Sequence, residues 1–546
     1  MQIARLIGGA GTGKTTELLK IMEGALEHIK DPTLLGFASF TRAARAEAVS
    51  RASSAWNVEP EVLSKAGWFR TVHSAVLRCL GPVARDLISE KEKDLQYLSE
   101  IFGVNLSTNI DDDLGKTRFV GDPTVSSALN CWSLARTTLT PLEDVIRRMR
   151  KIDDNVTDYA KCVQLIERYE TSKRIDGRMD FDDMLLMFAG ISCSPRSGVS
   201  MVTPLGDIPA VHAWLFDEQQ DASPLLDAAC KRLVSAPSVK WAYVVGDPFQ
   251  AIYGFAGSSS SCFMAWDAHK ERIMPKSYRC PRAILELGER CLRGTRGYFD
   301  RGIAPADHDG FVHDSCSIDD IVDMIEPSHD WLLIARTNYQ AARFSAALHS
   351  KRKPHKWTTQ PDGETNASAG MKGLLSLESG SPITGDQWLH AMALIPQKGK
   401  DGEVFITRGT KAKWKDPDVV SEWDRIWPED LEKVGATEHL VKMIRDASWV
   451  GLINKGKQWR DTAKRWGVEL ACEPRVRVGT IHSVKGAEAD NVAMLTTTSK
   501  TVQKGCEDRN QSDEEHRIAY VGVTRAKRNL YVINEGHSGT PRMEMP

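Results

Sequence analysis

The feature that most constrains this chain stands at its beginning, in the run Gly8-Gly9-Ala10-Gly11-Thr12-Gly13-Lys14-Thr15. This run fits the pattern G-x-x-x-x-G-K-[ST]. The mostly apolar residues 3–7 predict a short buried strand before it, and residues 16–20 favour a helix after it. Glycines let backbone N–H groups turn toward phosphate oxygens, and a helix N-terminus adds partial positive charge. Lys14 suits the β- and γ-phosphates, and the Thr15 hydroxyl suits Mg²⁺. The alternative is a glycine-rich turn that binds nothing.

Length and composition set the frame for this loop. A chain of 546 residues is too long for one hydrophobic core, so several domains are expected. No apolar run approaches the length of a membrane span. No two of the eleven cysteines have C-x-x-C spacing, so we expect reduced thiols in a cytoplasmic protein. The net charge of −2 means that any nucleic-acid contact must come from local basic patches.

Further α/β units follow the loop. Residues 34–40 predict a second buried strand, residues 41–47 a helix, and residues 69–74 the end of the second unit. Between about residues 81 and 178 the pattern becomes helical. Leu142, Val145, Ile146 and Met149 share the spacing of one helix face. This region has few strand signals and indicates a helical insertion, after which residues 180–186 resume the first domain.

An acidic cluster follows the predicted strand at residues 211–216. It reads Asp217-Glu218-Gln219-Gln220-Asp221, and acids at the carboxyl end of a strand are where an open α/β sheet holds a metal. Asp217 suits the outer shell of Mg²⁺, and Glu218 suits a general base for water. Such a cluster alone is more often a solvated strand end, but a phosphate loop in the same chain favours the catalytic interpretation.

A second polar segment follows the predicted strand at residues 241–245. Gln250 can orient water or sense the γ-phosphate, and Tyr253 and Phe255 follow it closely. The two aromatic rings are either a stacking platform for unpaired bases or ordinary core side chains. The residues alone leave both alternatives open.

An ordered series of motifs then resembles the UvrD/Rep/PcrA-type DNA helicases of superfamily 1. The resemblance covers nearly the whole chain. After the phosphate loop come residues 39–44 (SFTRAA), 71–74 (TVHS), 217–221 (DEQQD), 246–250 (GDPFQ), 277–281 (SYRCP), 479–488 (GTIHSVKGAE) and 515–526 (EHRIAYVGVTRA).

The resemblance implies a role for individual residues of the nucleotide site. Tyr278 would stack on adenine, Glu488 would hold the ribose, and Gln250 would couple the γ-phosphate to DNA. Arg279 and Arg525 would be arginine fingers.

The nucleotide-binding set would be Gly8 to Thr15 with Thr16, Tyr278 and Glu488. The catalytic set would be Lys14, Glu218, Gln250, Arg279 and Arg525. Mg²⁺ would be bound by Thr15 and, through water, by Asp217. The residues that contact DNA would be Phe40, His73, Tyr253, Phe255, Arg336 and His482.

The resemblance also implies the domain organisation. We expect an α/β fold with two RecA-like P-loop domains, each a parallel sheet with flanking helices and each with a mainly helical inserted subdomain. Domain 1 would comprise residues 1–82 and 179–271, with residues 83–178 inserted. Domain 2 would comprise residues 272–348 and 473–546, with residues 349–472 inserted. The second insertion is rich in tryptophan.

Two stretches of the second insertion interleave cations with tryptophan, residues 411–415 (KAKWK) and 455–466. Basic residues among aromatic side chains suit contact with DNA phosphates and stacking on bases. For the second stretch, an amphipathic helix with its Trp side chains inward and its Lys side chains in solvent is an equal alternative.

The chain departs from the family pattern in three ways. Only residues 1–7 precede the phosphate loop, so a Gln-containing adenine-recognition segment is not expected there. Thr16 stands where many relatives have Arg. We also find no match to the β-hairpin that separates strands in larger relatives. We therefore expect weak selectivity for the base of the nucleotide, and uncertain power to unwind duplex DNA.

The resulting hypothesis is an ATP-dependent DNA helicase or translocase that moves 3′→5′ on single-stranded DNA and uses Mg²⁺ with ATP. Its expected partners are single-stranded and tailed duplex DNA and replication or repair proteins. It would be a monomer or weak oligomer without a membrane anchor. The alternatives are a single-strand translocase with little unwinding, and an ATP-switched loading or regulatory factor.

Overall fold

The computed structural model describes the chain apart from residues 41, 85, 90, 112–115, 152–155, 315–316, 361–365, 455, 537–539, 544 and 546. Thr41 and Lys455 of the stretches quoted above therefore lie outside the described residues. The chain forms two compact units. Unit 1 comprises Met1–Val312, Thr496–Leu530 and Gly536–Pro546, and unit 2 comprises His313–Leu495 and Tyr531–Glu535.

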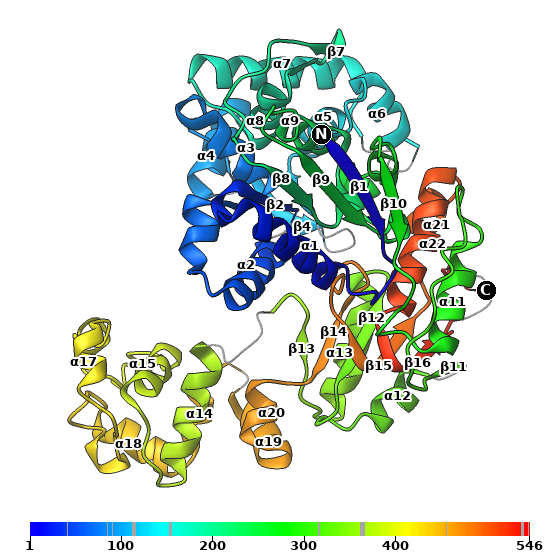
Figure 1. The fold of residues 1–546 in the computed structure, drawn as a ribbon. Helices are drawn as coiled ribbons and strands as arrows, with labels where there is room; N and C mark the ends of the chain where they lie inside the picture. Colours follow the sequence, from blue (N-terminus) through cyan, green and yellow to red (C-terminus); the bar gives the residue numbers. More distant parts are fainter. Residues whose placement is uncertain are drawn as a thin grey trace. The chain divides into compact units, whose positions relative to one another are not determined.

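The first sheet has six strands in the order β10-β1-β9-β8-β2-β3, and the neighbouring strands run parallel (Figure 1). Its strands are β1 (Gln2–Ile7), β2 (Leu35–Ser39), β3 (Trp68–Thr71), β8 (Ala213–Phe216), β9 (Trp241–Gly246) and β10 (Lys270–Ile273). Its helices are α1 (Lys14–Ile29), α2 (Arg42–Trp56), α3 (Val72–Leu80), α8 (Phe181–Ala189), α9 (Pro224–Leu233) and α10 (Ser260–Met264).

Helices cover both faces of this sheet, because its strands are apolar on both sides. Trp214 and Phe216 of β8 pack into a core with α3, α8 and α9. Leu215, between them in sequence, points to the opposite face and packs with α1 and α2. Alternation of side chains along a strand produces this division. A parallel sheet buried on both faces is the arrangement expected from its continuous apolar strands.

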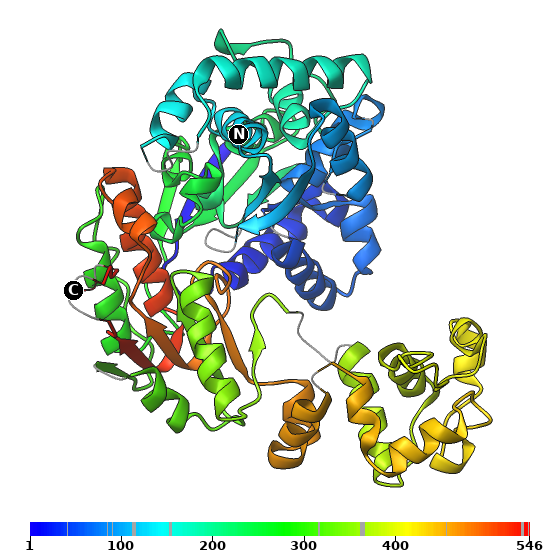
Figure 2. The same cartoon turned by 180° about the vertical axis from the view of Figure 1, so that it is seen from behind.

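The first insertion is mainly helical, as expected (Figure 2). Its buried side chains form a core of their own. Its helices are α4 (Glu92–Phe102), α5 (Pro123–Thr138), α6 (Leu142–Met149) and α7 (Tyr159–Ile175). Leu142, Val145 and Ile146 are buried on one face of α6, which confirms the helical periodicity. The hairpin of β4 (Leu106–Asp111) and β5 (Lys116–Gly121) was not anticipated. A second hairpin, β6 (Ile191–Ser194) and β7 (Gly198–Met201), follows α8.

The second sheet has the strand order β11-β16-β15-β12-β14-β13. Strand β12 pairs in parallel with both β14 and β15, and α12 and α13 contribute to the core on one face. The strands are β11 (Phe311–Asp314), β12 (Trp331–Ala335), β13 (Lys356–Trp357), β14 (Val476–Thr480), β15 (Ala489–Leu495) and β16 (Ala526–Ile533). Helices α12 (Ile318–Met324) and α13 (Asn338–Ser350) belong to unit 2, whereas α11 (Arg282–Leu292), α21 (Lys500–Gly505) and α22 (Arg509–Val523) belong to unit 1. The expected fold class, two RecA-like sheets with flanking helices, is confirmed.

The second insertion is a set of short helices with a separate core. They are α14 (Asn366–Glu378), α15 (Gly385–Leu394), α16 (Thr410–Lys413), α17 (Pro417–Ser421), α18 (Glu438–Arg445), α19 (Gly456–Trp466) and α20 (Val468–Cys472). Trp414 is only 3% exposed and belongs to this core. Its ring cannot stack on a base in this conformation, so the prediction that Trp414 contacts DNA is wrong.

Over the part of the chain that the structure describes, no helix has the length and apolar character needed to cross a membrane.

Candidate active site

The phosphate loop connects β1 to α1 and has the conformation that its glycines predict. Gly11 and Gly13 have φ values of 68° and 78°, in the left-handed region that favours glycine. Gly13 caps α1 without a side-chain hydrogen bond, so the first N–H groups of the helix can bind an anion. A Cβ atom on Gly11 would lie 2.3 Å from the Cβ atom of Arg279. Gly11 therefore also permits a close approach of the Tyr278–Arg279 segment.

The acidic pair lies beside this loop, at the end of β8. Asp217 is 3% exposed and accepts hydrogen bonds from Thr15 Oγ1 at 3.4 Å and from the Glu218 amide at 2.9 Å. Desolvation, followed by the charge of Glu218, raises the pKa of Asp217 to about 7. A cation would relieve both effects, and Thr15 and Asp217 supply the hard oxygen atoms that Mg²⁺ prefers. The residues present therefore fit a magnesium ion bound with a nucleotide.

Glu218 has the geometry of a functional residue. Its φ of 54° is left-handed, which is uncommon for a residue other than glycine and is typical of strained sites. Its Oε1 atom lies 3.7 Å from Lys14 Nζ, and its Oε2 atom accepts a hydrogen bond from the Gln220 amide group. The Gln220 Oε1 atom in turn accepts from the Asp247 backbone N–H at 3.0 Å. A hydrogen-bonded chain thus links Glu218 to the end of β9.

Tyr278, Arg279 and Arg525 are three further residues of the predicted nucleotide site. Tyr278 is 70% exposed, and a Cβ atom on Gly13 would lie 3.9 Å from the Tyr278 ring. The Tyr278 amide donates to the Gly11 carbonyl at 2.8 Å. Arg525 is 1% exposed, and burial followed by the neighbouring charge of Arg279 lowers its pKa to about 10. Two neighbouring cations, one of them buried, favour the binding of an anion close to them.

Comparison with known proteins agrees with this geometry. The family model described as the UvrD/REP helicase N-terminal domain matches residues 2–270, and the model of the UvrD-like helicase C-terminal domain matches residues 463–536. The chain belongs to the UvrD/Rep family of ATP-dependent DNA helicases. It is therefore an enzyme of the ATP-dependent DNA helicase class.

Several curated proteins are similar to this helicase. The putative ATP-dependent DNA helicase YjcD of Bacillus subtilis is 22% identical over 96% of this chain and 76% of its own length. The ATP-dependent DNA helicase UvrD2 of Mycobacterium tuberculosis is 23% identical over 69% of this chain. This helicase spans about half, 55%, of that relative's length. The RecB subunit of Mycolicibacterium smegmatis is 28% identical over 24% of this chain and 12% of its own length.

The residues expected to contact DNA divide between the two units of the helicase. In unit 1, Phe40, His73, Tyr253 and Phe255 are all half-buried. The rings of Tyr253 and Phe255 meet edge to face with centroids 6.0 Å apart. In unit 2, Arg336 and His482 are 5% and 3% exposed, and Glu488, expected to hold the ribose, is half-buried. The roles of these residues stay predictions.

Sequence reasoning missed the hydrogen bonds that converge on Asp247, and it missed Arg301 altogether. The Asp247 carboxylate accepts hydrogen bonds from Gln250, Tyr520 and Arg301, and Tyr520 also accepts from the Ala10 amide of the phosphate loop. Asp247 and Tyr520 lie within recognised motifs, which was a usable signal. Arg301 lies in no motif that we identified, so its sequence context did not indicate a role.

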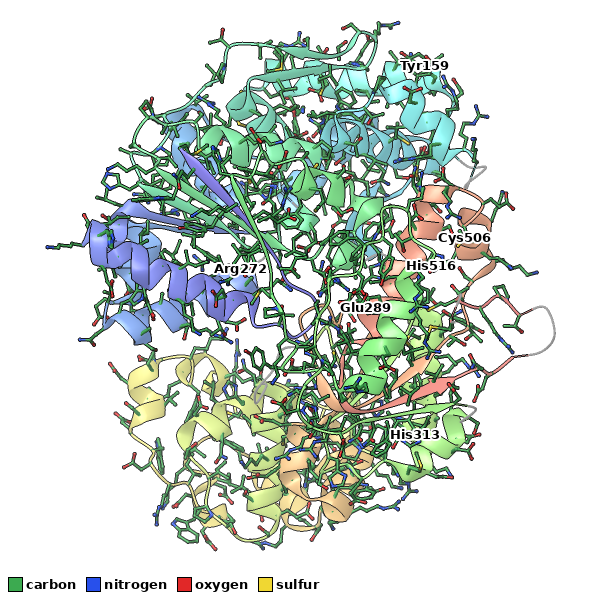
Figure 3. All side chains as sticks on the ribbon, turned by 45° about the vertical axis from the view of Figure 1, so that its right-hand side comes forward. Tyr159, Arg272, Glu289, His313, Cys506 and His516 are labelled. Carbon is green, nitrogen blue, oxygen red and sulfur yellow. The ribbon has the colours of Figure 1, made fainter. Side chains whose placement is uncertain are left out.

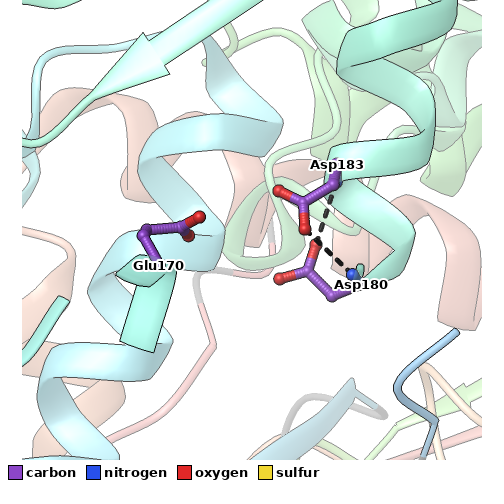
Figure 4. Close-up of side chains that lie close together, drawn as sticks. All are labelled: Glu170, Asp180 and Asp183. Atoms are coloured by element: carbon purple, nitrogen blue, oxygen red, sulfur yellow. Dashed lines mark hydrogen bonds between the residues drawn. The ribbon is translucent and has the colours of Figure 1, made fainter. Parts of the chain in front are cut away.

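A separate acidic cluster joins α7 to α8. Carboxylate oxygens of Glu170, Asp180 and Asp183 lie within 4.8 Å of one another. Figure 4 shows these three side chains. Lys173 Nζ contacts all three acids at 2.6–3.0 Å, and Arg136 contacts Asp180 and Asp183 at 2.8 and 3.0 Å. Two cations already compensate these acids, so the cluster is an internal ion-pair network of the helicase and does not carry a metal-site hypothesis.

Proposed function

We propose that this protein hydrolyses ATP to move 3′→5′ along single-stranded DNA, and that it separates duplex strands as it moves. The observation that carries the proposal is the convergence on one phosphate loop of an acid pair from β8 and the Tyr278–Arg279 segment. Lys14 and Glu218 lie 3.7 Å apart there. Phosphoryl transfer needs these parts, namely a phosphate cradle, a base for water and cations for the developing charge.

Each side chain then has a distinct task. Lys14 contacts the β- and γ-phosphates, and Glu218 accepts the proton of the attacking water. Gln250 orients that water and senses the γ-phosphate. Arg279 and Arg525 stabilise the charge that develops in the transition state, as positioned cations do. Tyr278 stacks on the base. Thr15 and, through water, Asp217 would hold Mg²⁺, which supplies further charge neutralisation when it is bound with ATP.

The domain organisation belongs to the same proposal. Residues 1–82 and 179–271 would be one RecA-like domain, and residues 272–348 and 473–546 the other, with insertions at residues 83–178 and 349–472. Phe40, His73, Tyr253, Phe255, Arg336 and His482 would form the track for single-stranded DNA. The expected substrates are single-stranded and tailed duplex DNA, and replication or repair proteins are the expected partners of a monomer or weak oligomer.

One assay separates this function from its rivals. ATP hydrolysis and strand displacement are measured with 3′-tailed, 5′-tailed and blunt duplexes. The proposal predicts DNA-stimulated hydrolysis and displacement of the 3′-tailed duplex above all. DNA-stimulated hydrolysis without strand displacement would instead indicate a translocase. A slow hydrolysis rate that DNA does not change would indicate an ATP-switched loading factor.

A further inference from the structure

Arg301 is an enclosed cation with two acidic partners. It lies in the segment that follows α11 and is 4% exposed. Its Nη1 atom donates to Asp247 Oδ1 at 2.6 Å, and its Nη2 atom donates to Glu289 of α11, which is labelled in Figure 3. The guanidinium also lies between two rings, with its carbon atom 4.8 Å from the Phe249 centroid and 5.1 Å from the Tyr520 centroid.

Asp247, one of the two partners of Arg301, accepts hydrogen bonds from two residues of recognised motifs. The Oδ2 atom of Asp247 accepts from Gln250 Nε2 at 2.9 Å and from the Tyr520 hydroxyl at 3.2 Å. The same hydroxyl accepts from the Ala10 amide at 3.1 Å. One carboxylate therefore holds both the side chain of Gln250 and, through Tyr520, an amide of the phosphate loop.

Charge and shape make Arg301 the group that holds this carboxylate. Asp247 is 0% exposed, and a buried carboxylate is stable only when it is paired. Among the hydrogen-bond donors to Asp247 that the structure describes, Arg301 is the one with a full charge. Its planar guanidinium binds Asp247 and Glu289 at once, which fixes its orientation and therefore the orientation of the Asp247 carboxylate.

We propose that Arg301 is a positioning residue for ATP hydrolysis. By holding Asp247, it holds Gln250 and the Ala10 amide in the geometry that turnover needs. Arg301 does not itself contact the reacting atoms in this arrangement. The inference rests on the proposed ATP hydrolysis and adds a residue outside the recognised motifs.

The test uses the full chain with single-stranded DNA and ATP. Arg301→Met keeps most of the volume of the side chain but removes its charge. We expect a lower melting temperature, affinity for a fluorescent ATP analogue within about threefold of the parent, and a kcat lower by about 10- to 100-fold, since small misplacement of catalytic groups has effects of this size. Arg296→Met is the matched control, because Arg296 pairs with Asp513 at 2.6 Å and does not contact Asp247. It should keep the parent kcat.

A double variant separates positioning from simple stability. Arg301→Met combined with Asp247→Asn removes the charges of Arg301 and of the fully buried Asp247, and of this trio leaves only the charge of Glu289, whose side chain is 18% exposed. We expect most of the melting temperature to return while kcat stays low. Arg301→Met should also reduce kcat little further when Gln250 is already Ala, because residues that act as a unit are not additive.

Four results would overturn the inference. These are a parental kcat in Arg301→Met, recovery of kcat together with melting temperature in the double variant, full additivity with Gln250→Ala, and an equal loss in Arg296→Met. If Arg301→Met does not fold, Arg301→Lys takes its place. Lys keeps the positive charge but lacks the planar guanidinium group that binds both carboxylates. We therefore expect a kcat about tenfold below that of the parent. A parental rate for Arg301→Lys would contradict the inference. A parent without DNA-stimulated hydrolysis would contradict the proposed function instead.

Discussion

The ammonium group of Lys14 and the carboxylate of Glu218 lie 3.7 Å apart, beside the phosphate loop and the end of β8. In this arrangement the cation that we propose to contact phosphate is next to the group that we propose as the general base. Nucleotide binding and hydrolysis can therefore be separated by changing one residue at a time.

Glu218→Gln should bind ATP but lose most turnover. A positioned general base contributes about 10²- to 10⁴-fold, and the amide keeps the shape of the side chain without its basicity. Lys14→Ala should weaken binding as well, because it removes a charge from the phosphates. Binding of a fluorescent ATP analogue and steady-state hydrolysis measure the two effects. A Glu218→Gln protein that hydrolyses ATP at the parent rate would show that another group is the base.

The exposed ring of Tyr278 predicts broad use of purine nucleotides. A stacked ring holds a base by contact area, and such contacts discriminate less than buried hydrogen bonds do. GTP should therefore support hydrolysis within about tenfold of ATP. Tyr278→Ala should raise KM for both nucleotides by a similar factor. Strict preference for ATP in the parent would mean that a polar group reads the edge of adenine.

Phe255 tests the predicted platform for DNA bases. If its half-buried ring stacks on a base, Phe255→Ala should weaken single-strand affinity by about 1–3 kcal/mol and spare hydrolysis without DNA. If the ring is core, the variant should lose about 3–5 kcal/mol of stability and both hydrolysis rates together. Phe263→Ala is the control for the core outcome, because Phe263 is 0% exposed. Melting temperature and the two rates decide between the outcomes.

We expect Arg70 to contact DNA phosphates. Desolvation and the nearby charges of Arg78 and Arg45 lower its pKa, and a phosphate would relieve this repulsion. Arg70→Ala should reduce the slope of log affinity for single-stranded DNA against log salt concentration by about 1, because one phosphate contact is lost. Arg51→Ala is the control, because Arg51 already pairs with Glu47 on α2. An unchanged slope in Arg70→Ala would place the residue away from DNA.

We expect Arg136 to stabilise the first insertion. Arg136→Met leaves Asp180, Asp182 and Asp183 with one cation fewer, and the loss of one partner from a buried ion pair destabilises by about 3–5 kcal/mol. Urea unfolding measures the loss. Arg147→Met, which breaks two exposed ion pairs on α6, should change stability little. A small effect of Arg136→Met would mean that Lys173 alone compensates the acids.

The same cluster predicts a pH dependence. Desolvation, followed by the charge of Asp180, raises the pKa of Asp183 from 3.8 to about 6. The folded protein therefore holds this proton while the unfolded chain releases it, so this contribution to stability falls as pH rises from 4 to 6. In Arg136→Met the carboxylate pKa values should rise further. That variant should then lose more stability than the parent between pH 5 and pH 8.

Much of the site could be predicted because its signals are local. Residues 3–7 predicted a strand, and β1 spans Gln2–Ile7. The glycines of the loop predicted positive φ values, and Gly11 and Gly13 have them. An acidic pair after an apolar run predicted a polar strand end, and Asp217 and Glu218 follow β8. In each case the conformation of a few neighbouring residues and the burial of one strand are sufficient.

The sequence by itself determined these parts, whereas the tertiary structure decided which distant side chains meet. Tyr520 reaches the Ala10 amide, and Arg301 reaches Asp247, across long stretches of chain. Trp414 stands among lysines in sequence yet lies inside a core. No local periodicity encodes such contacts, because the burial of a charge or a ring depends on which elements pack around it. An unpaired carboxylate is costly only when it is buried, so the need of Asp247 for a partner such as Arg301 arises only in the folded protein.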